Sequence, residues 1–198
     1  MSPNRACPDT GSSIIEMVVV LAVLGIVVQT VAPAFVRWRQ ARRLEAAAEE
    51  LVLYAVGLRA AAASAGASRG IAIDSVAGSI AWTPIADGDG DGLRRADMRA
   101  GRDVALGPSR NLRSNYPGVL AGLPDGVRTP AGGMPPSDGV AFGRGDLLSL
   151  SADGTATSGS LYLQNQFGDA VAVRIYGATA RFSLWRRRHS DGIWRRRW

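Results

Sequence analysis

The chain contains one cysteine, Cys7, one histidine, His189, and no lysine among its 198 residues. A single cysteine can form no intramolecular disulfide and cannot supply the paired thiolates of a CxxC metal or redox site. His189 stands in an arginine run, and neither GxGxxG nor GxxxxGK occurs. The sequence therefore predicts no catalytic residue, no cofactor and no enzymatic activity.

All 23 basic residues are arginine, against 17 acidic residues, which gives a formal net charge of +6. Biased codon usage explains this as well as selection for guanidinium chemistry does. A basic balance fits nucleic acid, an anionic lipid surface or an acidic protein partner, and net charge alone does not choose among them. The positions of the arginines must decide.

An apolar run from Ile14 to Val36 holds 23 residues, of which only Glu16, Gln29 and Thr30 are clearly polar. As a helix it would be roughly 35 Å long, enough to cross a hydrocarbon core of about 30 Å. A secretory signal peptide fits less well, because the run continues into Val-Arg-Trp-Arg where a small-residue cleavage site would directly follow it, and a core helix is rarely apolar on every face. We predict a transmembrane helix over residues 12–36, with those two as alternatives.

Glu16 is anomalous, because a carboxylate in a membrane helix costs a few kcal/mol unless it has a partner. Residues 11–21, Gly-Ser-Ser-Ile-Ile-Glu-Met-Val-Val-Val-Leu, resemble the prepilin peptidase site of type IV pilin-like proteins. The resemblance implies that residues 1–11 are a leader cleaved after Gly11, and that Ser12 becomes the N-methylated first residue. It also implies that Glu16 acts in assembly by neutralising the N-terminal amine of a neighbouring subunit.

Pro33 stands 21 residues after Ser12, where helices of this family commonly kink, and its ring and missing N–H give the physical reason. The chain departs from the family at Ser12 and Ser13, where an aromatic residue and a threonine are usual. Four arginines follow the span: Arg37, Arg39, Arg42 and Arg43. The positive-inside rule would hold this end in the cytoplasm, whereas the cleavage motif requires the amino end there and the C-terminal domain in the periplasm.

Residues 37–65 continue the helix as an amphipathic segment. Apolar residues recur at spacings of four and three, in the order Leu44, Ala48, Leu51, Ala55, Leu58 and Ala62. Glu45, Glu49, Glu50 and Arg59 fall elsewhere on the helical wheel, so one face is expected to pack on a globular domain. Gly66 and Gly70 end the pattern, which predicts one helix over residues 14–65. A solitary anchor with a coiled-coil stalk is the alternative.

Residues 66–186 carry β signals and predict a small β domain. Short runs with alternating apolar residues predict strands at residues 70–74, 79–83, 139–142, 147–150, 160–163, 170–176 and 180–185. The last three predict an antiparallel meander. Residues 84–138 are expected to form long loops. The predicted fold class is α+β, with a long N-terminal helix packed on a small antiparallel β-sandwich.

Asp87, Asp89 and Asp91 alternate with glycine, and such carboxylates can wrap one hard cation such as Ca²⁺. An EF-hand loop needs an acidic residue at its twelfth position, which here is Met98. We therefore prefer an aspartate-glycine turn, and a metal site at these three residues is the weaker alternative.

Residues 154–163 and 171–177 are similar to the carboxyl end of the GspH and FimT-like pseudopilins. With the cleavage motif, this implies a minor pseudopilin, a structural subunit of a type II secretion pseudopilus that serves protein secretion from the bacterial inner membrane. The implied partners are other pseudopilins or pilins, prepilin peptidase and inner-membrane lipid.

Residues 187–198 are predicted to be an Arg/Trp-rich tail. The alternative function, a FimT-like minor type IV pilin that binds DNA during uptake, is motivated by six arginines interleaved with tryptophans: Arg186, Arg187, Arg188, Arg195, Arg196 and Arg197. Arginine neutralises phosphates and tryptophan stacks on bases. Against this, the glycine-arginine-x-arginine motif of DNA-binding FimT proteins would begin at Gly177, and Ala178 and Ala180 stand where its arginines belong.

Overall fold

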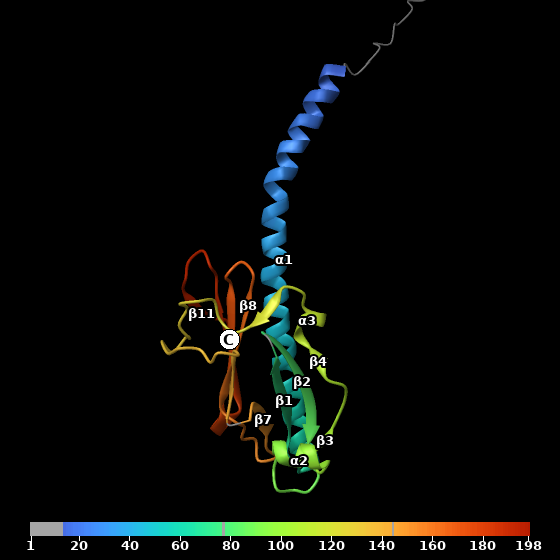
Figure 1. Ribbon diagram of the computed structural model, residues 1–198, viewed down its shortest axis with the longest axis vertical. Helices are drawn as coiled ribbons and strands as arrows, with labels where there is room; N and C mark the ends of the chain where they lie inside the picture. The colour runs from blue at the N-terminus through green and yellow to red at the C-terminus, as the bar shows by residue number, and fades with distance from the viewer. Residues whose placement is uncertain (1–13, 77, 144) are drawn as a thin grey trace, which may run out of the picture. The chain divides into compact units, whose positions relative to one another are not determined.

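The computed structural model describes residues 14–76, 78–143 and 145–198 (Figure 1). Helix α1 (Ile14–Ala65) is the first element, and it covers the residues for which the apolar pattern predicts one helix. The chain divides into two compact units, residues 1–39 and residues 40–198, and α1 contributes to both.

In the second unit, the predicted stripe of α1 is confirmed. All six of its members are at most 7% exposed: Leu44, Ala48, Leu51, Ala55, Leu58 and Ala62. Glu45 was expected on the outer face of the helix, but it is 3% exposed, so that expectation is wrong. The buried face also takes in Ala47 and Val52 and is therefore wider than the stripe, because side chains from two sheets pack against the helix.

The first sheet has the strand order β3-β2-β1-β7, and β4 also pairs with β2. Its strands are β1 (Arg69–Val76), β2 (Ser79–Ala86), β3 (Val104–Ala105), β4 (Arg110–Asn111) and β7 (Leu147–Leu150). Every pairing is antiparallel. Gly70 of β1 permits a close approach, because a Cβ atom there would lie 2.2 Å from the carbonyl oxygen of Leu148 in β7.

The second sheet has the strand order β11-β10-β9-β8-β5, and β6 also pairs with β8. Its strands are β5 (Val119–Ala121), β6 (Val140–Phe142), β8 (Gly159–Asn165), β9 (Ala170–Tyr176), β10 (Arg181–Arg187) and β11 (Trp194–Arg196). Consecutive antiparallel pairing of β8, β9 and β10 confirms the predicted meander. A short 3-10 helix, η1 (Gly177–Thr179), connects β9 to β10.

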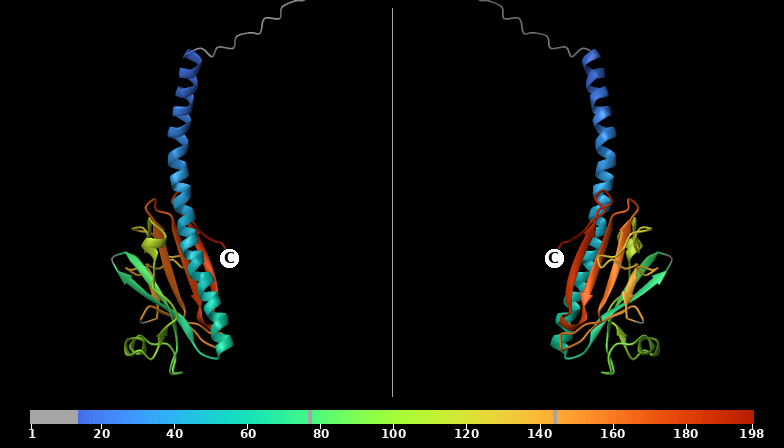
Figure 2. Two further views of the ribbon diagram at one scale, coloured as in Figure 1. Left: turned by 90° about the vertical axis from the view of Figure 1, so that its right-hand side faces the viewer. Right: turned by 90° about the vertical axis from the view of Figure 1, so that its left-hand side faces the viewer.

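In the second unit, one hydrophobic core lies between α1 and the two sheets. Buried apolar side chains of α1 meet those of both sheets in a single cluster, with Ile71 and Leu148 from the first sheet and Phe142, Val173 and Leu184 from the second. Figure 2 shows strands of both sheets beside the C-terminal half of α1. The α+β class and the order of a long helix followed by antiparallel sheets are thus confirmed.

The segment of residues 84–138, expected to form long loops, contains several short elements. These are the end of β2, strands β3, β4 and β5, and the helices α2 (Arg95–Ala100) and α3 (Leu112–Asn115). Asn111 caps α3, because its side-chain oxygen accepts hydrogen bonds from the backbone N–H groups of Arg113 and Ser114. Residues 122–139 connect β5 to β6 without a helix or strand.

Residues 187–198 do not form a separate tail. Strand β11 pairs with β10 as a hairpin, with Trp185 opposite Arg196 and Arg187 opposite Trp194. Trp185 and Trp194 pack on a second apolar cluster, whose buried members are Leu123, Tyr162, Ala170 and Ala172. The indole N–H of Trp194 also donates a hydrogen bond of 2.8 Å to the carbonyl oxygen of Arg128. Burial of indole surface gives the hairpin an apolar anchor that a solvated arginine tail would lack.

Candidate functional site

The predicted cleavage and methylation sites, Gly11 and Ser12, lie outside the described residues. Glu16 lies in the first turn of α1 and is exposed. Pro33 lies inside α1, which is assigned without a break across it, and a kink there stays a prediction. Within the described residues, no hydrogen bond or ion pair joins Glu16 to another candidate residue.

The first unit presents its apolar side chains outward. Among residues 14–39, every residue whose exposure is described is exposed, including Ile14 at 83%, Leu21 at 62% and Phe35 at 56%. In the described part of the chain, α1 is the one helix long and apolar enough to cross a membrane, judged by length and composition alone. An apolar surface of this extent requires lipid or other proteins to cover it.

Four arginines of the β10–β11 hairpin line one cleft. In the antiparallel register Arg186 lies directly opposite Arg195, so their side chains project from one face. With Arg188, Arg197, Asp191 and Ile193 they enclose a cavity of about 290 Å³. The structure thus brings together four of the six arginines considered for DNA binding.

Glu45 of α1 contacts two of the arginines that line this cleft, and its side chain is only 4% exposed. Its Oε2 lies 3.2 Å from Nη1 of Arg42 and 3.7 Å from Nη2 of Arg197. Its Oε1 is in ion-pair contact with Nη1 of Arg186, although the angles are not those of a hydrogen bond. Since a buried carboxylate is costly without cations beside it, Glu45 ties α1 to the hairpin.

Three arginines of the hairpin have other contacts. Arg187 donates to the carbonyl oxygens of Gly192 and Gly168, at 3.2 and 3.5 Å, and Arg196 donates to that of Trp198 at 3.2 Å. Arg195 pairs with Asp191 at 3.2 Å, with its side chain 72% exposed. An exposed pair of this kind holds its arginine weakly.

The three aspartates singled out in the sequence do converge. One carboxylate oxygen each from Asp87, Asp89 and Asp91 lies within 4.8 Å of the other two. Burial and the neighbouring Asp89 raise the pKa of Asp91. Asp87 accepts hydrogen bonds from the backbone N–H groups of Gly90 and Gly92, at 2.7 and 3.0 Å, which is the predicted turn.

Arginines also neutralise this acidic loop. Arg102 contacts the carboxylates of both Asp89, at 3.2 Å, and Asp97, which is buried, while Arg94 pairs with Asp91. The loop thus supplies its own cations. The three carboxylates would suit a hard cation by chemistry, but two of them already hold guanidinium groups.

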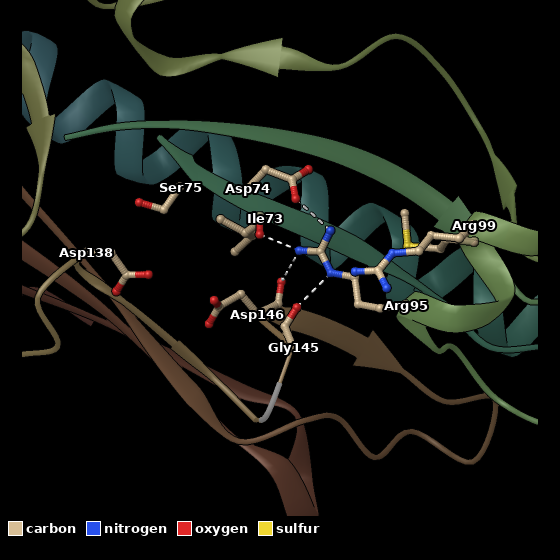
Figure 3. Close-up of a pocket in the computed structure, with 9 residues that line it drawn as sticks. Ile73, Asp74, Ser75, Arg95, Arg99, Asp138, Gly145 and Asp146 are labelled. Carbon is tan, nitrogen blue, oxygen red and sulfur yellow. Dashed lines mark hydrogen bonds and ion pairs between the residues drawn. The ribbon is translucent and has the colours of Figure 1, made fainter. Parts of the chain in front are cut away.

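Sequence reasoning missed a cavity of about 690 Å³ beside β1 and α2 (Figure 3). Arg95 crosses it and donates to the carbonyl oxygens of Ile73, Gly145 and Asp146, the last two at 2.7 and 3.3 Å, and to the carboxylate of Asp74 at 2.7 Å. Burial raises the pKa of Asp146, whose φ is 48°. These contacts hold the turn before β7 against β1, so the role of Arg95 is structural.

Glu50 forms a further polar cluster that the sequence did not reveal. It pairs with Arg110 and accepts a hydrogen bond of 2.6 Å from the hydroxyl of Tyr116. Arg110 lies over the rings of Tyr54 and Trp82, 5.4 and 5.3 Å from their centroids, in cation–π contacts. Burial and the Glu50 carboxylate raise the pKa of Tyr116 to about 12.

Comparison with known proteins gives no relative: no family model, no curated protein and no solved structure matches the chain significantly.

Proposed function

We propose that the protein is a minor pseudopilin-like subunit, a structural component of a type II secretion pseudopilus rather than an enzyme. The observation that carries the proposal is the division of α1. Residues 14–39 expose an apolar surface all round, whereas residues 44–62 bury their apolar face in the β domain. The first part of this helix has exposed apolar side chains, and the second part buries its apolar side chains in the β domain. This division suits a membrane anchor that also packs with other subunits in a filament.

In this proposal residues 1–11 are removed by prepilin peptidase, and Ser12 becomes the methylated first residue. The chain is anchored in the inner membrane with its β domain in the periplasm. Glu16 then pairs with the N-terminal ammonium of a neighbouring subunit. Two unit charges about 4 Å apart attract by roughly 4 kcal/mol at an effective dielectric of about 20, which is enough to govern subunit docking.

The DNA-binding alternative is favoured by the gathering of four arginines in one cleft. It is opposed by Glu45, which engages Arg186 and Arg197. The positions of the missing motif arginines, Ala178 and Ala180, lie in and just after η1, and Ala180 is fully buried. A filament subunit therefore stays the preferred function.

Processing tests the proposal. When the full chain is coexpressed with a prepilin peptidase, intact-mass measurement should show loss of residues 1–11, because Gly11 is the only glycine before the span and Glu16 follows at the spacing the motif requires. Coexpression with an inactive peptidase is the control. A product that retains Cys7 under active peptidase would remove the pseudopilin interpretation.

A further inference from the structure

The cleft of the β10–β11 hairpin, with the neighbouring turn of α1, carries an excess of positive charge. Five arginines contribute to it: Arg42, Arg186, Arg188, Arg195 and Arg197. The carboxylates among them are Glu45 and Asp191. Five cations against two anions leave three positive charges around one cavity.

Glu45 organises this cleft. Its side chain is nearly inaccessible and holds Arg186 and Arg197, whose own side chains are 19% and 44% exposed. Arg188 and Arg195 remain exposed at the same cavity. Arg186 is thus held inside the cleft by Glu45, and the exposed arginines are accessible to an anion from solvent.

The chemistry of the cleft matches a phosphate group. A guanidinium group presents paired N–H donors that fit two phosphate oxygens, and its weak hydration favours contact over solvent separation. A cavity of about 290 Å³ lies near the lower limit for small-molecule sites and admits one headgroup-sized anion.

The short chain segment between the apolar run and Glu45 indicates a lipid headgroup as the source of such an anion. Glu45 follows Val36, the last residue of the apolar run, by nine positions. Even a fully extended chain of that length reaches only about 30 Å. If residues 14–36 span a bilayer, chain connectivity thus keeps Glu45 within about 30 Å of the end of the span. Arginines also follow the span directly, on the side where the positive-inside rule does not expect them, and an anionic lipid surface attracts arginines at such a position.

We propose that this arginine cleft binds the phosphate of an anionic phospholipid headgroup, with Arg188 and Arg195 as its accessible contacts. The proposal rests on the membrane placement given under Proposed function. It does not depend on leader cleavage.

Native mass spectrometry of the full chain in neutral detergent tests it, with phosphatidylglycerol and phosphatidylcholine as probes. The wild type should retain more phosphatidylglycerol than phosphatidylcholine. Because one arginine near an anionic lipid surface contributes about fivefold in affinity, Arg188→Gln/Arg195→Gln should weaken retention roughly 25-fold. Both residues are exposed, so circular dichroism should stay unchanged.

Arg99→Gln/Arg113→Gln is the matched control, because it removes two exposed arginines outside the cleft and changes the net charge equally. The control should bind like the wild type. Equal losses in both double variants, or no loss in either, would overturn the cleft as the site. Equal retention of phosphatidylcholine by the wild type would overturn the requirement for an anion.

Two competitors distinguish other sources of phosphate. Displacement of phosphatidylglycerol by equimolar inorganic phosphate would assign the cleft to free anions, and stronger displacement by a short single-stranded oligonucleotide would assign it to nucleic acid. Either result overturns the lipid proposal. An uncleaved chain with normal lipid selectivity would overturn the pseudopilin function alone, which keeps the two failures separate.

Discussion

The two parts of α1 place similar side chains in opposite surroundings. In residues 14–39, Leu21 and Leu24 are 62% and 53% exposed, whereas Leu44 and Leu51 in the second unit are 1% and 2% exposed. Both parts are helical, so helix formation does not distinguish them. The second part is stabilised by burial against its own domain. The described residues of the first part have no such burial within their unit, and an exposed apolar surface of this extent is typical of a segment that contacts lipid or another protein.

The largest expected effect is on the free energy of unfolding, and it should appear when leucine is replaced by alanine in each part of α1 separately. Leu51→Ala leaves a cavity in the core and should lower the free energy of unfolding of the β domain by about 3 kcal/mol. Leu21→Ala removes the same atoms from an exposed position and should leave that free energy unchanged. Guanidinium denaturation of the full chain in detergent, followed by tryptophan fluorescence, measures both. Equal destabilisation by the two variants would break the comparison.

A smaller effect should follow from removing the buried charge of α1. Glu45→Gln leaves Arg186 and Arg197 beside a neutral amide and should lower the free energy of unfolding by about 2 kcal/mol. The loss is less than for a fully buried pair, because water reaches the arginines. Glu49→Gln is the matched control, on the same helix but partly exposed, and should change stability by less than about 0.5 kcal/mol. A Glu45→Gln variant as stable as its control would show that the ion pairs do not hold the hairpin.

The smallest effect concerns alkaline pH and Tyr116. Its pKa is about 12 in the folded protein, above the ordinary value of 10, so the folded state retains a proton that the unfolded state loses. The stabilisation is complete below pH 10 and is lost as pH rises towards 12. Because the ring is only partly buried, the loss should be about 1 kcal/mol. Tyr116→Phe should lack this component, as denaturation at pH 9 and pH 11.5 would show. An identical decline in both proteins would contradict the assignment.

Elements with a local periodic signal were predictable from the sequence. The strands β1, β2, β7, β8, β9 and β10 lie where alternation of apolar residues placed them, to within a few residues at their ends. The buried stripe of α1 follows the 3.6-residue repeat. Such signals are readable because each depends on neighbours only a few positions away.

The hairpin of β10 and β11 was hidden by its composition. The arginine runs predicted an Arg/Trp-rich tail at residues 187–198, although Trp185, Arg187, Trp194 and Arg196 belong to one face of the strand pair. Two tryptophans supply that face with the apolar surface that a strand needs to pack. The available signal was the Asp191-Gly192 turn sequence between two runs that each carry a tryptophan, and the high charge obscured it.

The polar sites were beyond sequence reasoning for a different reason. Glu45 and Arg186 are 141 positions apart, and Arg95 meets the carbonyl oxygens of residues about 20 and 50 positions away. A helical wheel describes one helix and cannot show that a second sheet covers its flank. Charge type gave the arginines their candidate roles, but only packing decided which of them face Glu45.

The sequence by itself determined the apolar span, the amphipathic continuation of the helix and the antiparallel β pattern, because each follows from residue chemistry repeated at a fixed short spacing. The tertiary structure alone decided that Glu45 is buried against Arg186 and Arg197 and that the terminal arginines line one cleft. It also decided that Arg95 holds the turn before β7 against β1. Those outcomes depend on contacts between distant segments, whose free energies arise only when the sheets close on the helix and exclude water.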